Sequence, residues 1–208
     1  MWRCVRRTCK RARLDASVGA RRSGGALLRA LASCGFSANV TALSVDALDN
    51  SDADLATVLE AFPALESCSL RFERILVVAE NALLRPSRVR RLSLACAAGD
   101  FGHRIGEAAA WCPRIAELSL AGPDLDCVAV LERLACYPGE LATLVVLRLC
   151  SVSRFGPEDG NRARSVLRAA RPGLDVSLCA HASAAPAEAH YWLARDGPCA
   201  FAREGPCA

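Results

Sequence analysis

The sequence predicts an α/β solenoid, a horseshoe arc with a parallel sheet on its concave side and helices on its convex side. Two observations predict it. A six-residue phrase with apolar residues at its first, fourth and sixth positions recurs, and a proline precedes every copy after the first. The closing apolar residues of the copies fall at positions 45, 70, 94, 120, 149 and 178, so the steps are 24 to 29 residues long. Steps of this length are typical of solenoids, in which each unit buries its apolar side against the next.

Each copy of the phrase predicts one strand. The copies are residues 40–45 (VTALSV), 65–70 (LESCSL), 89–94 (VRRLSL), 115–120 (IAELSL), 144–149 (LVVLRL) and a degenerate sixth at 174–178 (LDVSL). Side chains alternate between the two faces of a strand. We therefore expect the paired apolar positions to point into the core and the residues between them to line the concave face.

Helices and turns are predicted between the strands. The prolines before the later strands are Pro63, Pro86, Pro113, Pro138 and Pro172. Proline cannot continue a helix, so each predicts a turn that ends the preceding segment. Helical spacing is visible over residues 54–62 and in the stripe of Val128, Leu131, Leu134 and Ala135. Asp52 and Asp124 are the predicted helix N-caps.

The composition predicts an ordered chain whose cysteines are reduced. Hydrophobic residues make up 52% of the 208 residues and charged residues 23%. Twelve cysteines are present, but they replace leucines or lie near predicted helix ends, as Cys34, Cys68, Cys112 and Cys136 do. We expect buried free thiols, which behave as small apolar groups. A disulfide framework is the alternative, and it would require secretion, for which the basic N-terminus offers no signal.

Charge and composition together divide the chain into three parts. Residues 1–30 carry nine basic side chains and one acidic one, so this segment is at +8 while the whole chain is at +4. The remainder is therefore at −4, which does not predict a nucleic-acid groove. We assign residues 1–22 to a basic head, residues 23–180 to five or six repeats, and residues 181–208 to an Ala/Pro-rich mobile tail.

Catalytic and metal-binding patterns are not found in the sequence. The three histidines are His103, His181 and His190, and no nucleophile elbow, phosphate-binding loop or His-Glu-x-x-His pair occurs. The best zinc candidates are Cys179, His181, His190 and Cys199, whose spacing does not give the close ligand pairs of structural zinc sites. No apolar run reaches the ~18 residues needed to span a bilayer. We expect a non-enzymatic protein with no cofactor, no metal, no nucleic acid and no membrane association.

The predicted interaction surface is the concave face. Serine occupies its central position in five of the six copies, and charged residues flank it. Two interpretations of this face are possible: it is a polar groove that binds a protein partner, or it contacts only water. The candidate binding residues are Ser44, Asp46, Ser69, Arg71, Arg91, Ser93, Glu117, Ser119 and Arg148. Because arginines outnumber acidic residues across its middle, we expect an acidic or phosphorylated peptide as ligand.

Three segments resemble parts of a known family. Residues 110–120 (AWCPRIAELSL) and, more loosely, residues 61–70 resemble the Cys-Pro-x-Leu-x-x-Leu-x-Leu phrase of leucine-rich repeats in F-box proteins. The resemblance implies the ribonuclease-inhibitor-like class, with helices on the convex side. Residues 2–14 resemble the last helix of an F-box. The other readings of this head are a mitochondrial targeting segment and a solvated basic arm.

These expectations give two functional hypotheses. The first is a cytoplasmic, non-catalytic scaffold for protein–protein interactions, specifically the substrate-recognition part of an F-box ubiquitin ligase, with ligase components among its partners. The second is a mitochondrial structural subunit whose basic head is cleaved on import.

Overall fold

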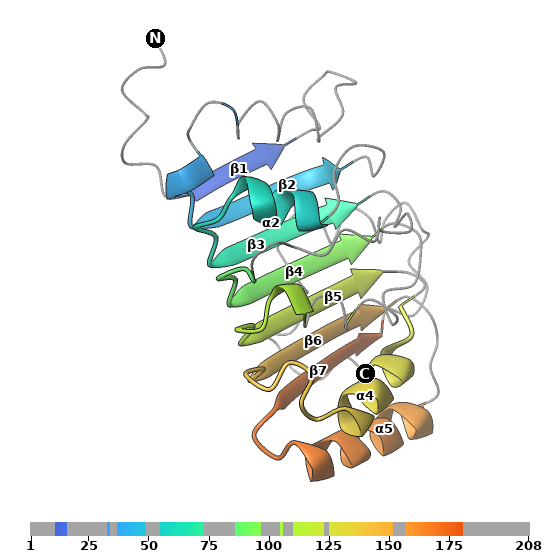
Figure 1. The fold of residues 1–208 in the computed structure, drawn as a ribbon. Helices are drawn as coiled ribbons and strands as arrows, with labels where there is room; N and C mark the ends of the chain where they lie inside the picture. The colour runs from blue at the N-terminus through green and yellow to red at the C-terminus, as the bar shows by residue number, and fades with distance from the viewer. Residues whose placement is uncertain are drawn as a thin grey trace.

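The computed structural model describes residues 11–15, 33, 37–48, 55–72, 86–96, 105, 110–122, 125–151 and 157–180. Within these ranges seven parallel strands form one sheet, and their order in the sheet is their order in the sequence (Figure 1). The protein is therefore of the α/β class, as predicted. The strands are β1 (Arg11–Asp15), β2 (Ala42–Leu48), β3 (Ser67–Phe72), β4 (Arg91–Cys96), β5 (Glu117–Gly122), β6 (Val146–Ser151) and β7 (Asp175–Ala180).

Four helices have both of their ends among the described residues. They are η2 (Ser37–Asn39), α2 (Leu55–Ala61), α4 (Cys127–Cys136) and α5 (Pro157–Ala170). Both α2 and α4 fall where the helical spacing of the sequence predicts them. The predicted tail, residues 181–208, and most of the basic head lie outside the described residues.

The strand phrases stack in register, so that apolar side chains form two continuous rows on one face of the sheet. The first row runs Leu43, Cys68, Leu92, Leu118, Leu147 and Val176; the second runs Val45, Leu70, Leu94, Leu120, Leu149 and Leu178. All of them are buried except Leu178, which is partly buried. Val58 of α2, Leu131 of α4 and Leu167 of α5 belong to the same core. Each fully buried leucine contributes roughly 1.5–3 kcal/mol through removal of apolar surface from water.

Each strand from β3 to β6 begins at the same hydrogen-bonded junction. One carbonyl oxygen of the preceding repeat accepts from two consecutive backbone N–H groups at the start of the next strand. The acceptors are the carbonyls of Thr41, Glu66, Arg90 and Ala116, at N···O distances of 2.7 to 3.1 Å. Because both donors of each pair are fixed, the junction holds the register that the apolar rows require.

Proline turns precede β3, β5 and β7, as predicted. Pro63, Pro113 and Pro172 each occupy the second position of a turn closed by a hydrogen bond from the fourth residue's N–H to the first residue's carbonyl. Proline favours this position because its fixed φ matches the turn. Pro138 occupies the same place in a turn that closes from Glu140 to Tyr137. Pro86 lies in no such turn; Ser87 next to it donates its N–H to the Trp111 carbonyl at 2.8 Å.

The N-cap of α4 differs from the expectation. Asp126 caps the helix, and its Oδ1 accepts from the Ala129 N–H at 2.9 Å. The prediction of Asp124 was therefore wrong by two residues. An N-cap side chain accepts from an N–H two or three residues later in the first turn, and Asp126 lies three residues before Ala129. Asp124 and the other predicted cap, Asp52, lie outside the described residues.

Strand β1 was not predicted. Arg11–Asp15 pairs in parallel with β2, from Arg11 opposite Ala42 to Asp15 opposite Asp46. These five residues are therefore extended, whereas the F-box resemblance implies a helix there. The physical reason is that the edge of β2 offers unpaired backbone donors and acceptors, which a neighbouring segment satisfies by forming a strand.

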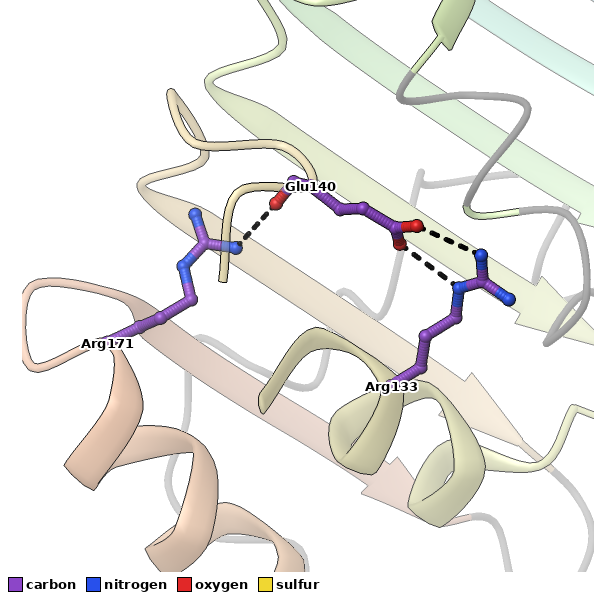
Figure 2. A network of polar contacts seen from close by, with 3 residues as sticks. All are labelled: Arg133, Glu140 and Arg171. Atoms are coloured by element: carbon purple, nitrogen blue, oxygen red, sulfur yellow. Dashed lines mark hydrogen bonds and ion pairs between the residues drawn. The ribbon is translucent and has the colours of Figure 1, made fainter. Parts of the chain in front are cut away.

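A polar network fixes the longer connection between α4 and β6. Arg133 of α4 donates from Nε and Nη2 to the two carboxylate oxygens of Glu140, at 3.1 and 3.0 Å (Figure 2). Arg171, just after α5, donates to the carbonyls of Glu140 and Leu141 at 3.2 and 2.6 Å. Leu141 has a φ of 51°, which is rare for a non-glycine residue. The two arginines thus hold an extra turn that lengthens this repeat.

Candidate functional site

The second face of the sheet carries a row of serines. The register places Ser44, Ser69, Ser93 and Ser119 opposite one another on β2 to β5, and Arg148 and Ser177 continue the row on β6 and β7. These positions alternate with the buried leucines, so the strand alternation expected from the sequence is confirmed. Adjacent side chains in the row are about 4.8 Å apart, which is the spacing of neighbouring strands.

Accessibility varies along this row. Ser69 is exposed, while Ser44 and Ser93 are partly buried. Ser119 is only 7% exposed, and Ala121 and Cys150, nearby on β5 and β6, are each 6% exposed. The expectation that Ser119 is available to a partner is therefore corrected. The accessible polar surface extends over β2 to β4 and over the first residues of β5 and β6.

Arg91 and Glu117 begin β4 and β5, and Arg148 is the third residue of β6. Arg91 lies directly opposite Glu117 in the register. Glu117 forms an ion pair with Arg148, with 3.7 Å between Oε2 and Nη1, and both side chains are more than 40% exposed. Exposed pairs of this kind contribute roughly 0.2–1 kcal/mol. Glu117 thus partly neutralises Arg148, whereas Arg91 is exposed and has no ion pair with another described residue.

Asp46 and Arg71 are described only in their backbone. Asp46 belongs to β2 and Arg71 to β3, as the repeated phrase predicts. The register shifts between Val45 and Leu48, so two residues of β2 stand against one of β3. Asp46 is therefore not opposite Arg71, although their equivalent places in the phrase predict that it would be.

Three further arginines lie at the strand-start edge of the sheet, and sequence reasoning missed them. Arg88, Arg90 and Arg114 are exposed and directly precede β4 and β5. The sequence analysis considered only residues within the strand phrases. Arg88 and Arg114 each stand immediately before the first apolar residue of a copy, and this recurrence was the signal that could have identified them.

The interior holds thiols of low reactivity. Among the described cysteines, Cys68 and Cys112 are buried free thiols, as expected, whereas Cys136 is free but exposed. Burial raises the pKa of Cys112 to about 11, although the Ser87 hydroxyl, which donates to its Sγ at 3.0 Å, acts in the opposite direction. Burial, together with nearby Cys112, also raises the pKa of Cys68. Both thiols therefore carry their protons at neutral pH, and the thiolate is the nucleophilic form.

Only one of the four predicted zinc candidates lies among the described residues. Cys179 lies in β7, whereas His181, His190 and Cys199 lie outside the described residues. Among the residues that are described, no three His, Cys, Asp or Glu side chains come together as metal ligands. In the same part of the chain, no helix has the length and apolar character required to cross a bilayer.

The chain was compared with protein-family models, with curated proteins and with solved structures, and no match was found in any of the three comparisons.

Proposed function

We propose that this chain is a repeat solenoid of the leucine-rich type that acts as a non-catalytic scaffold for protein–protein interactions. The observation that carries the proposal is the two-sided sheet. Its strands hold two apolar rows on the buried face and an in-register polar row on the other. The repeated carbonyl junctions at steps of 24 to 26 residues, from Thr41 to Ala116, support the repeat interpretation.

The surface chemistry supports recognition of a peptide segment. Ser44, Ser69 and Ser93 present small hydroxyl groups that both donate and accept hydrogen bonds. Small side chains in such a row leave room for an extended chain to lie across them. Arg91 adds an exposed positive charge beside it. An acidic or phosphorylated peptide is therefore the ligand that fits best, since charge complementarity sets register and specificity.

A more specific version of the proposal is the substrate-recognition part of an F-box-type ubiquitin ligase. It rests on the resemblance of residues 110–120 to F-box leucine-rich repeats, and not on the head, whose residues 11–15 are extended. Affinity purification of the tagged chain tests this version. Recovery of the ligase adaptor and cullin supports it, whereas recovery of other partners leaves the general scaffold.

The scaffold proposal is tested by placing a negative charge in the middle of the polar face. Ser69→Glu changes an exposed residue of β3, and Ala169→Glu is the matched control at an exposed position of α5. Proteins captured by the wild type and by Ala169→Glu should be lost with Ser69→Glu. Equal capture by all three proteins contradicts binding at this face.

A further inference from the structure

Four exposed arginines lie at or just before the starts of β4 and β5. In Figure 1 all strands of the sheet start along one edge. We call this group the basic rim; it consists of Arg88, Arg90, Arg91 and Arg114. Only Arg91 belongs to the polar face described above. The other three lie in the junctions that lead into the strands.

The junctions before β4 and β5 place the backbone segments that carry the four arginines next to each other. Arg88 precedes Val89 and Arg114 precedes Ile115, and both of these apolar residues are completely buried. The Arg90 carbonyl accepts from the N–H groups of Ala116 and Glu117 at 2.7 and 2.9 Å, which fixes the two junctions next to each other. Arg88 and Arg114 therefore lie just before adjacent strands, each next to the first buried apolar residue of its phrase.

Within the described part of the chain, none of these four arginines takes part in an ion pair. Glu66 precedes the neighbouring strand β3, and Glu117 begins β5 opposite Arg91, already paired with Arg148. The four like charges thus outnumber the two carboxylates beside them. A ligand with negative charge relieves their mutual repulsion, and such a patch steers acidic partners by its field.

We infer that the basic rim binds a short acidic segment of a protein partner and anchors the peptide that the proposed scaffold recognises; the inference rests on that proposed function. The rim covers the starts of β4 and β5, one strand spacing or about 5 Å, so an extended segment of roughly 2–3 residues at 3.3 Å per residue reaches across it. Two or three Asp, Glu or phosphorylated side chains in such a segment match the four arginines.

A protein segment fits this surface better than a nucleic acid does. A nucleic-acid backbone carries a charge on every phosphate and continues beyond the rim, so it meets the carboxylates of Glu66 and Glu117. Single-stranded nucleic acids also require aromatic side chains on which bases stack. Among the described residues the one exposed large aromatic side chain is Tyr137, which caps the end of α4 and is not part of the rim.

The test measures fluorescence anisotropy of a labelled hexaglutamate peptide with four forms of the full chain at low salt. The rim variant is Arg88→Gln with Arg114→Gln. The charge-matched control is Arg162→Gln with Arg168→Gln, at exposed positions of α5. Ser69→Glu reports on the polar face. We expect the rim variant to weaken binding about fivefold or more and the control less than about twofold, as the loss of two exposed charge pairs implies.

The other outcomes separate the rim inference from the proposed scaffold function. If Ser69→Glu weakens binding and the rim variant does not, the scaffold proposal stands and the rim inference is wrong. If neither variant changes binding, hexaglutamate binds elsewhere on the chain, and both the rim and the polar face are wrong as its site. If the wild type does not bind hexaglutamate, the acidic ligand is wrong. A labelled twelve-residue thymidine oligonucleotide that binds more tightly than hexaglutamate, and is lost with the rim variant, overturns the choice of a protein partner.

Discussion

At the scale of single residues, the leucines and serines of the strands have opposite surroundings. Leu118 is fully buried between the equivalent leucines of β4 and β6, whereas Ser69 faces water one position from a buried row. Substitutions of the same chemical kind should therefore have very different effects at the two sites. This contrast follows from strand alternation and from the register of the repeats.

Leu118→Asp should destabilise the fold by about 4 kcal/mol or more, because it removes core packing and buries an unpaired charge. Ser69→Asp introduces the same side chain at an exposed position and should change stability by less than about 0.5 kcal/mol. Urea unfolding followed by circular dichroism measures both. Similar losses of stability in the two variants would contradict the assignment of the faces.

The Cys112 thiol should make stability sensitive to alkaline pH. Its pKa rises from the ordinary 9.0 to about 11 through burial, so the folded state holds this proton more tightly than the unfolded state. Its contribution is complete below pH 9 and is lost as pH rises from about 9 to about 11, by about 3 kcal/mol in total. Cys112→Ala should flatten the fall in unfolding free energy between pH 8 and 10.5. The exposed Cys136→Ala is the control, and an equal flattening there would contradict this origin.

At the scale of elements, α4 and α5 depend on polar contacts at their ends. Asp126 caps α4, and Arg171 ties the end of α5 to the turn that precedes β6. The Arg171 side chain is partly removed from water, and this desolvation lowers its pKa. The carbonyls of Glu140 and Leu141 thus gain a charged donor that the helix alone does not supply.

Arg171→Met should cost about 1–3 kcal/mol, because two carbonyls lose their charged donor while the aliphatic volume is kept. Arg168→Met, at an exposed position of the same helix, should be nearly neutral. Thermal unfolding of both variants is the measurement. Indistinguishable melting temperatures would show that the contacts around Leu141 do not hold this turn.

Asp126→Ala should lower the stability of α4 by about 1 kcal/mol, because the Ala129 N–H loses its acceptor. Glu132→Ala, in the same helix and exposed, is the control. Hydrogen exchange at the start of α4 should accelerate in the first variant alone. Unchanged exchange in Asp126→Ala would contradict the cap.

At the scale of the whole molecule, the sequence predicts the strands that carry the repeated phrase. It does not predict the features that depend on contacts between segments far apart in the sequence. The leucine phrase predicts β2 to β7, and Pro63, Pro113 and Pro172 predict the turns before β3, β5 and β7. Strand β1 carries no such phrase; it is defined by pairing with β2, which a local pattern does not encode. The burial of Ser119 likewise results from packing and not from its place in the phrase.

The candidate surface was also predictable only in part from the sequence. The position of the serines and of Arg91 follows from alternation alone. The ion pair of Glu117 with Arg148 requires the register between β5 and β6, which places Arg148 two residues beyond the partner of Glu117. The basic rim depends on junction residues whose proximity becomes visible only when the repeats are stacked.

The central claim is that the polar face and its rim bind an acidic peptide. The most direct measurement is the binding of the wild type, Ser69→Glu and Ala169→Glu to an array of decapeptides that are acidic, phosphoserine-containing or basic. The account predicts that the wild type and Ala169→Glu bind acidic and phosphorylated peptides and that Ser69→Glu loses most of this binding. A preference for basic peptides, or equal binding by Ser69→Glu and the wild type, would contradict it.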